Sequence, residues 1–291
     1  MSQSLGSKRH AITDKRLLNE KSFAEAWYRW APKQRVFLDG VTQSMLRVAQ
    51  IQPGIKILDL ASGPGNPALQ FAEAVTPSGM VTATDISPDM VASAQRGANQ
   101  LGLSNMKFRV ADADALPFDT DSFDRITCRF GIMYFSDTQR ALSEVMRVCK
   151  PGGRAVFVSW GPEEQPFFAS THGIVSKYMQ VPLRPDAPDT FAFAQPGLLQ
   201  QALDNAGFKN VNEEALTIEM LWPGSPADLW KFFQEVTASF AEMKQSLSPG
   251  NWQHVTNEVK TALSVYARDE HVCLSGMVNL ALGIVPATNE K

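Results

Sequence analysis

The sequence predicts an α/β protein with a doubly wound, mostly parallel sheet of seven strands and an inserted helical cap. Three observations support this fold class. Short apolar runs alternate with helical patterns between Ile55 and Trp160, a glycine-rich loop joins the first run to a helix, and an apolar helical stretch separates the last two predicted strands. Strands that alternate with helices form parallel sheets with right-handed crossovers. Ligands are therefore expected at the carboxyl ends of the strands.

Helices are expected to precede the sheet. The first twenty residues are polar and are expected to fray, whereas apolar residues at helical spacing run from Phe23 to Val48. We expect an interruption of this helical pattern near Pro32. Residues 1–50 are therefore predicted to form an N-terminal helical segment or flap.

The stretch 51–160 is predicted to be the cofactor-binding α/β core. Asn66-Pro67 and Ser87-Pro88 each place a capping residue before a proline at the first helical position, which predicts a helix after each pair. Strands are expected at 55–60, 80–84, 106–110, 123–128 and 154–160, and a further helix at 138–148.

The regular alternation ends after Trp160. Residues 161–196 are rich in proline and phenylalanine and too long for an ordinary connection, so we predict that they form a lid. Two helical segments, which open at Ser225-Pro226 and at Trp252, predict a cap inserted at 226–268. The remainder of the core sheet is expected at 197–225 and 269–291, with a helix over 196–206 and strands over 208–221 and 272–285, the last antiparallel.

The composition argues against several classes of protein. An apolar share of 44%, a charged share of 20% and a formal net charge of −3 are typical of a globular protein and do not favour nucleic-acid binding. No apolar stretch approaches the ~20 residues that span a bilayer, so we expect a cytoplasmic protein without stable membrane insertion. Cys128, Cys149 and Cys273 are widely spaced, which indicates neither a disulfide framework nor a metal site. The oligomeric state is left open.

The densest motif is the loop from Asp59 to Asn66, where a strand leads into a helix. Its glycines let backbone approach a ligand, and the start of the helix offers free N–H groups. By itself the loop fits two cofactor classes. One is a dinucleotide, since Gly63-x-Gly65 is followed about 20 residues later by an acid, Asp85, as in the dehydrogenase fingerprint. However, the Asp59 carboxylate would repel a pyrophosphate and attract the ammonium group of an amino acid.

Four motifs follow successive strands: the loop 59–65, Asp85, Ala111-Asp112-Ala113 and the run 150–153. Their order and spacing resemble those of class I S-adenosylmethionine-dependent methyltransferases. The run 129–135 is most similar to the ubiquinone/menaquinone-biosynthesis type of small-molecule methyltransferase. The resemblance is specific over about residues 52–160. It implies a Rossmann-like fold, S-adenosyl-L-methionine as the cofactor and S-adenosyl-L-homocysteine as its product.

The resemblance also implies which residues hold the methionine part of the cofactor. They are Asp59, Ala61, Gly63 and Gly65. Ala61 stands where the family usually has glycine, which narrows the conformational freedom of the loop. Because alanine adds only a methyl group, cofactor binding is expected to survive.

The nucleoside part of the cofactor is assigned in the same way. Asp85 would accept both ribose hydroxyls, with Ile86 beside it, and Asp112 would accept the adenine amino group next to the backbone of Ala113. Taken alone, Asp112 could also be a solvated loop acid, but its position after the third strand favours a functional role. 

Arg129 would follow the fourth strand near the sulfonium. The alternative for Arg129 is an ordinary surface ion pair with Asp137.

Two candidate residues come from outside these motifs. Tyr28 is predicted to contact the cofactor from an aromatic flap, although aromatic residues at helical spacing more often belong to a core. His172, in the predicted lid, is the histidine best placed to act as a general base, although a histidine in a loop is more often solvated. No metal cluster or Ser-His-Asp arrangement stands out in the sequence.

We therefore predict methyl transfer to an oxygen, nitrogen or carbon of a small, largely apolar acceptor by in-line displacement. The many aromatic residues of the cap favour an aromatic, polyketide, terpenoid or quinone-like acceptor, although they must also pack the cap onto the core. Orientation and exclusion of water can suffice because the sulfonium is already activated. Two alternatives stay open: a nicotinamide-dependent oxidoreductase and a non-catalytic S-adenosylmethionine-binding protein.

Overall fold

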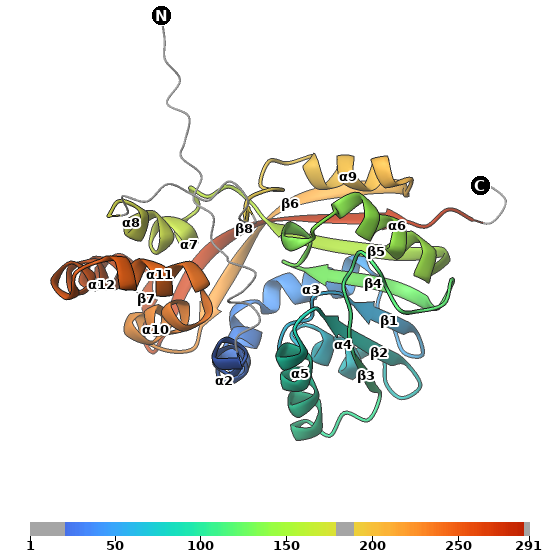
Figure 1. The fold of residues 1–291 in the computed structure, drawn as a ribbon, viewed down its shortest axis with the longest axis horizontal. Helices are drawn as coiled ribbons and strands as arrows, with labels where there is room; N and C mark the ends of the chain where they lie inside the picture. Colours follow the sequence, from blue (N-terminus) through green and yellow to red (C-terminus); the bar gives the residue numbers. More distant parts are fainter. Residues whose placement is uncertain (1–20, 179–188, 288–291) are drawn as a thin grey trace, which may run out of the picture.

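The computed structural model describes residues 21–178 and 189–287. Its centre is a sheet in the order β3-β2-β1-β4-β5-β8-β6, which confirms the predicted fold class (Figure 1). A two-residue strand, β7 (Ala267–Arg268), pairs with β8 as an addition to the seven expected strands. The strands are β1 (Lys56–Asp59), β2 (Met80–Asp85), β3 (Met106–Val110), β4 (Phe123–Arg129), β5 (Cys149–Trp160), β6 (Lys209–Trp222) and β8 (His271–Ile284).

The sheet is parallel from β3 to β5, and β8 runs antiparallel to both β5 and β6. The chain order reverses around β1, which pairs with β2 on one side and β4 on the other. In sheets of this type the loops at such a reversal separate and leave a crevice beyond the carboxyl ends of the strands. The loops after β1 and β4 flank that crevice here.

Helices cover both faces of the sheet, and neighbouring strand residues point into different cores. Ile57 and Val156 pack in a core with α3 and α4, whereas Leu58 and Phe157 pack in a second core with α6 and α9. The alternation follows from the two-residue period of a strand. The helices are α2 (Lys21–Phe37), α3 (Asp39–Val48), α4 (Ala68–Ala74), α5 (Pro88–Gln100), α6 (Thr138–Val148) and α9 (Leu198–Ala206), with a short 3-10 helix η1 (Ile132–Tyr134).

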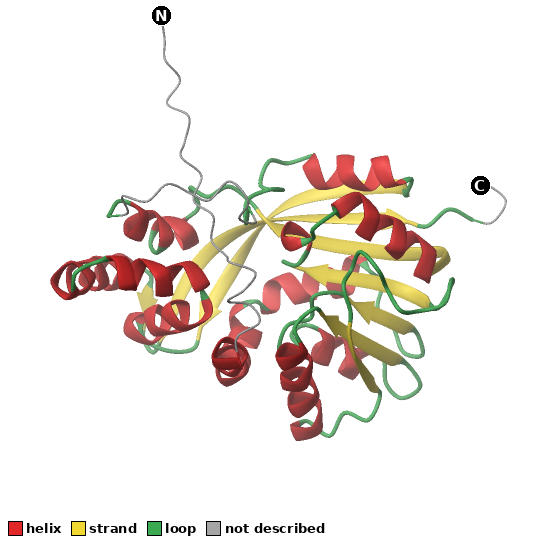
Figure 2. Ribbon diagram, in the orientation of Figure 1, coloured by secondary structure: helices red, strands yellow, loops and turns green. Residues whose placement is uncertain are grey.

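Three helices between β6 and β8 lie together at one end of the molecule, beside the far ends of these two long strands (Figures 1 and 2). They are α10 (Pro226–Val236), α11 (Ala238–Ser246) and α12 (Pro249–Ser264). The short helices α7 (Pro166–Ala169) and α8 (His172–Ser176) pack beside them. The sequence predicted two helical segments here, but the first divides at Thr237 into α10 and α11. The division into a lid at 161–196 and a cap at 226–268 stays a prediction, and residues 179–188 lie outside the described part of the chain.

Two local predictions were wrong. Pro32 lies inside α2, and the helical direction changes at Leu38 instead. Asn66 does not cap α4, because its Nδ2 donates to the carbonyl oxygen of Ala31, 2.9 Å away on α2. For Asn66, a contact distant in sequence outweighed a local preference. By contrast, Ser87 caps α5 by accepting a hydrogen bond from the backbone N–H of Met90, as predicted.

Within the described ranges, no helix has both the length and the apolar character needed to cross a bilayer.

Candidate functional site

A cavity of about 390 Å³ lies at the carboxyl ends of β1, β2 and β4. Its wall combines the loops that follow these strands with α2 and with the helices α7, α8, α10 and α11. Eight of the residues predicted from the sequence line it together: Ala61, Gly63, Asp85, Ile86, Asp112, Ala113, Arg129 and His172. Three predicted residues, Asp59, Gly65 and Tyr28, are not part of the wall.

The loop after β1 takes an unusual backbone path. Ala61, Gly63 and Gly65 have φ angles of 50°, 53° and 107°, in the left-handed region. A side chain at Gly65 would lie 3.1 Å from Leu69 and 3.3 Å from the backbone of Ala94, so glycine is required there by both conformation and space. A Cβ on Gly63 would meet no atom within 4 Å. Gly65 therefore shapes the loop, while Gly63 faces open space in the cavity wall.

Asp85 ends β2 and anchors the glycine loop. One carboxylate oxygen accepts a hydrogen bond from the backbone N–H of Gly63 and the other from that of Ser87, both at 2.9 Å. Burial raises the pKa of Asp85, and these backbone hydrogen bonds oppose the rise. Each carboxylate oxygen can accept a second hydrogen bond. Asp85 can thus hold the loop and still receive two donors from a ligand.

Asp59 lies behind the loop and is fully buried. Its Oδ1 accepts a hydrogen bond of 2.5 Å from the Thr127 hydroxyl, and its Oδ2 has no hydrogen-bond partner among the described residues. Burial raises the pKa of Asp59 to about 7, against the opposing effects of Thr127 and Arg129. The cavity wall does not include Asp59, so this carboxylate can act on a ligand through its charge but not by direct contact.

Arg129 ends β4 and is buried in the cavity wall. Its Nη1 donates to the Thr42 hydroxyl of α3 at 2.8 Å. Burial lowers the pKa of Arg129 to about 10, although Asp59 and Asp39 act in the opposite direction. The alternative of an ion pair with Asp137 was wrong, because the Asp137 carboxylate caps α6 by accepting from the Arg140 backbone N–H at 3.0 Å.

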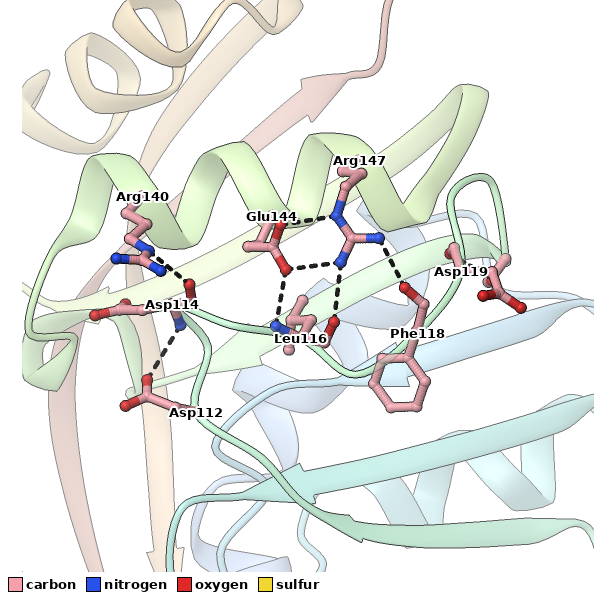
Figure 3. Close-up of polar contacts among 9 residues, drawn as sticks. Asp112, Asp114, Leu116, Phe118, Asp119, Arg140, Glu144 and Arg147 are labelled. Atoms are coloured by element: carbon pink, nitrogen blue, oxygen red, sulfur yellow. Dashed lines mark hydrogen bonds and ion pairs between the residues drawn. The ribbon is translucent and has the colours of Figure 1, made fainter.

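Asp112 lies in the loop after β3, and its side chain is exposed. Its Oδ1 accepts a hydrogen bond from the backbone N–H of Asp114 at 3.1 Å (Figure 3). The start of this loop is joined to β2, since the Ala111 N–H donates to the Asp85 carbonyl oxygen at 3.0 Å. Asp85 and Asp112 therefore lie at the carboxyl ends of the neighbouring strands β2 and β3 and line the same cavity.

Aromatic side chains form the opposite part of the wall. Phe130 stacks on Trp160 with ring centroids 3.9 Å apart and an interplanar angle of 8°. Trp160 in turn stacks on Phe167 at 5.0 Å, and Phe167 meets Phe168 and Phe233 edge to face. Such a wall can bury a flat apolar molecule.

His172 is the first residue of α8 and is buried, with 2% of its surface exposed. It is therefore not a solvated loop residue. Its Nδ1 lies 3.2 Å from Oε1 of Glu163, and its ring lies 6.0 Å from that of Phe240. A carboxylate beside one ring nitrogen fixes the orientation of an imidazole.

Residues 40–183 match the model of the ubiE/COQ5 methyltransferase family. The chain is similar to that family over these residues, which make up just under half of its length. The predicted resemblance is thereby confirmed, and S-adenosyl-L-methionine is the cofactor of such methyltransferases. The comparisons give no support to the oxidoreductase alternative.

Individual relatives agree with this assignment. The chain is 33% identical to a ubiquinone/menaquinone biosynthesis C-methyltransferase, UbiE, of Bordetella parapertussis over 50% of this chain and 59% of the relative. It is 37% identical to an uncharacterized methyltransferase, YcgJ, of Bacillus subtilis over 45% of this chain and 51% of the relative. A crystal structure of YcgJ aligns with a TM-score of 0.56 and 21% identity over 84% of this chain and 97% of that one, which supports the fold. The chain spans about half the length of the curated relatives it matches.

The residues around the cavity fit S-adenosylmethionine in their chemistry. The Ser62 hydroxyl is buried in the cavity wall and has no hydrogen-bond partner among the described residues, which leaves a polar group for the amino-acid part of the cofactor. Asp85 retains acceptor capacity for ribose hydroxyls, and Gly63 leaves open space beside it. Across the described ranges, no cluster of three or more His, Cys, Asp or Glu residues could hold a metal ion.

The sequence also left parts of the wall unidentified. Tyr28 does not reach the cavity but lies in the contact between α2 and α5. The guanidinium carbon of Arg96 lies over the Tyr28 ring, 4.1 Å from the ring centroid. The residues of α2 that do line the cavity are Phe23, Trp27, Gln34 and Phe37. Their spacing follows one face of a helix, a signal that could have identified them. No sequence signal links Thr42 to Arg129, because 87 residues separate them.

Proposed function

We propose that this protein transfers the methyl group of S-adenosyl-L-methionine to a small, largely apolar acceptor. One observation carries the proposal: a single cavity joins the acidic and glycine-rich loops to an aromatic wall. Donor and acceptor can therefore meet inside one enclosure. The net charge of −3 favours a small-molecule acceptor over a nucleic acid.

The loops after β1, β2 and β3 provide the cofactor side of this proposal. Ala61 and Gly63 contact the methionine part, while Asp59 and Gly65 act on it through the shape and charge of the loop. Asp85 accepts the ribose hydroxyls with Ile86 beside it. Asp112 accepts the adenine amino group, next to the backbone of Ala113. The supporting observation is that six of these eight residues share one cavity wall: Ala61, Gly63, Asp85, Ile86, Asp112 and Ala113.

The aromatic side binds and orients the acceptor. The bound cofactor supplies a methyl group that is already activated by a sulfonium. Phe130 and Trp160 offer a flat face against which an acceptor can align, and the buried phenylalanines around Phe167 exclude water. When the methylated atom is an oxygen or nitrogen that carries a proton, His172 accepts that proton while Glu163 holds its Nδ1. A carbon acceptor would use the same orientation.

Isothermal titration with S-adenosylhomocysteine, beside oxidised and reduced nicotinamide dinucleotides, tests the cofactor. We expect binding of S-adenosylhomocysteine alone, and binding of a dinucleotide alone would favour an oxidoreductase. A screen of aromatic and quinone-like acceptors with S-adenosylmethionine then tests turnover by the release of S-adenosylhomocysteine. Cofactor binding without methylation of any acceptor would support a non-catalytic binding protein.

A further inference from the structure

Asp112 lies in a loop whose conformation is fixed mainly by residues other than Asp112 itself. Residues 111–122 connect β3 to β4 without a strand or helix. Asp112 is exposed, and its carboxylate accepts one hydrogen bond within the loop, from the backbone N–H of Asp114. An exposed side chain is not fixed by packing, so the direction of this carboxylate follows the backbone of the loop. That backbone must be held from elsewhere.

Helix α6 holds the loop through one polar face. Arg140, Glu144 and Arg147 follow one another at intervals of four and three residues, which places them on the same side of the helix. Figure 3 shows these three side chains pointing from α6 onto the loop. The opposite face of α6 carries buried apolar residues that pack on the sheet, among them Leu142 and Val145. One face of the helix thus packs on the core, and the other face binds the loop through hydrogen bonds.

Glu144 and Arg147 together occupy both backbone groups of Leu116. The Leu116 N–H donates to Oε2 of Glu144 at 2.8 Å, and its carbonyl oxygen accepts from Nη2 of Arg147 at 2.9 Å. Arg147 also donates to the carbonyl oxygen of Phe118 at 2.7 Å. The two charged side chains join each other through two hydrogen bonds of 2.7 Å. This paired, planar geometry makes the contact more rigid than a single ion pair.

Arg140 adds a further hydrogen bond from α6 to the loop, closer to Asp112. Its Nε donates to the carbonyl oxygen of Asp114 at 3.0 Å, two residues from Asp112. The Asp112 carbonyl oxygen in turn accepts from the Ala115 N–H at 3.1 Å, one residue before Leu116. A short chain of backbone bonds therefore connects the Glu144–Arg147 pair to Asp112.

We propose that Glu144 and Arg147 are positioning residues that hold Asp112 in the direction needed to select the 6-amino group of adenine. This inference rests on the proposed function, in which Asp112 accepts that amino group. A carboxylate in the right place attracts an amino group and repels a carbonyl oxygen, so it discriminates adenine from hypoxanthine. A carboxylate on a loose loop can move away from either base and loses this discrimination.

The test compares two ligands that differ at C6, where an amino group replaces a carbonyl oxygen, and at N1, which carries a proton only in hypoxanthine. Isothermal titration measures the Kd of S-adenosylhomocysteine and of its hypoxanthine analogue, S-inosylhomocysteine. We expect the unmodified protein to prefer the adenine ligand by about tenfold or more, the effect of one hydrogen bond to a charged group. Arg147→Met should lower this preference to within about threefold, because the Asp112 carboxylate is then no longer held beside the 6-position of the base. Loss of stability alone would weaken both ligands equally and leave the preference unchanged.

A matched control is available at the opposite end of the sheet. Lys150 and Asp124 form an ion pair of 2.6 Å with side chains 41% and 26% exposed, close to the 35% and 22% of Arg147 and Glu144. Lys150→Met removes this pair without touching the loop, and we expect it to keep the preference for adenine. A reduced preference in Lys150→Met comparable to that of Arg147→Met would overturn the proposal.

A double-mutant cycle separates positioning from a direct effect. Asp112→Ala should itself remove the preference for adenine, and adding Arg147→Met should then change the preference no further. An unchanged preference in Arg147→Met alone overturns the inference while leaving the proposed function standing. Failure of the unmodified protein to bind S-adenosylhomocysteine overturns the proposed function instead. Should Arg147→Met not fold, Glu144→Ala frees the Leu116 N–H and carries the same test with the same criterion.

Discussion

Phe130 and Trp160 lie face to face in the cavity wall, with ring centroids 3.9 Å apart. Phe130 follows Arg129 directly and has a φ angle of 60°, which is rare for a bulky residue. Its N–H donates to the Val158 carbonyl oxygen of β5 at 2.8 Å, so the sheet helps to hold this conformation. Strained backbone at such a junction is typical of ligand sites.

Trp160→Leu tests the acceptor side of the cavity. We expect binding of a planar aromatic probe, 2-naphthol, to weaken by about tenfold because a stacked ring and its buried area are lost. Binding of S-adenosylhomocysteine should stay within about twofold, since its proposed contacts lie on other loops. Both affinities can be measured by isothermal titration. Trp252→Leu, in a tryptophan pair with Trp230 outside the cavity wall, is the control, and an equal loss of 2-naphthol binding there would contradict the prediction.

Asp85→Ala tests the ribose contact. Each lost hydrogen bond to the charged carboxylate should cost roughly 1.5–3 kcal/mol, so the Kd of S-adenosylhomocysteine is expected to rise by about a hundredfold or more. The Gly63 N–H also loses its acceptor, which adds to the effect. Asp124→Ala, which likewise removes a carboxylate that accepts from a backbone N–H but lies at the other end of its strand, should leave cofactor affinity unchanged. Unchanged affinity in Asp85→Ala would refute the ribose assignment.

Asp59 predicts a pH dependence of stability. Burial raises its pKa from the usual 3.8 to about 7, so between these values the folded protein binds a proton that the unfolded chain releases. The contribution of Asp59 to the free energy of unfolding therefore falls as pH rises through this window. Asp59→Asn removes the effect, and its stability relative to the unmodified protein should rise by up to about 4 kcal/mol between pH 4 and pH 8. Urea denaturation at several pH values measures the difference.

Asp124→Asn gives the opposite sign and serves as the control for Asp59. Burial raises the pKa of the Asp124 carboxyl, but hydrogen bonds from Lys150 and Lys56 outweigh it and lower that pKa overall. The stabilising contribution of Asp124 is therefore present above its unfolded pKa and is lost as pH falls through its folded one. Relative stability of Asp124→Asn should fall as pH rises. The same sign of change in both variants would contradict the assigned pKa directions.

Thr42→Val tests the support of Arg129. Valine keeps the shape of threonine but removes the hydroxyl that accepts from Nη1 of Arg129. We expect a loss of about 1.5–3 kcal/mol in the free energy of unfolding, since a buried charged donor loses its partner. Thr256→Val removes a hydroxyl that accepts from the uncharged Trp230 indole, so it should cost less, about 0.5–1.5 kcal/mol. Urea denaturation compares the two, and an equal or smaller loss for Thr42→Val would contradict this role.

The strands, the glycine loop and two helix caps could be predicted from the sequence because local forces determine them. Short apolar runs predicted the strands, and Ser87 and Ser225 cap α5 and α10 by accepting from N–H groups three residues away. Asp85 and Asp112 were also found locally, since each follows its own strand. The parallel order of the strands then placed them on one cavity.

The tertiary structure alone decided the contacts between distant segments. Asn66 bonds to Ala31 and not to its own helix, Arg129 pairs with Thr42 and not with Asp137, and His172 is buried beside Glu163 in the cavity wall. Each outcome depends on which segments the folded sheet brings together. A local pattern limits what a residue can do, but a buried polar group must find its partner among whatever groups surround it, and only the packed chain determines those.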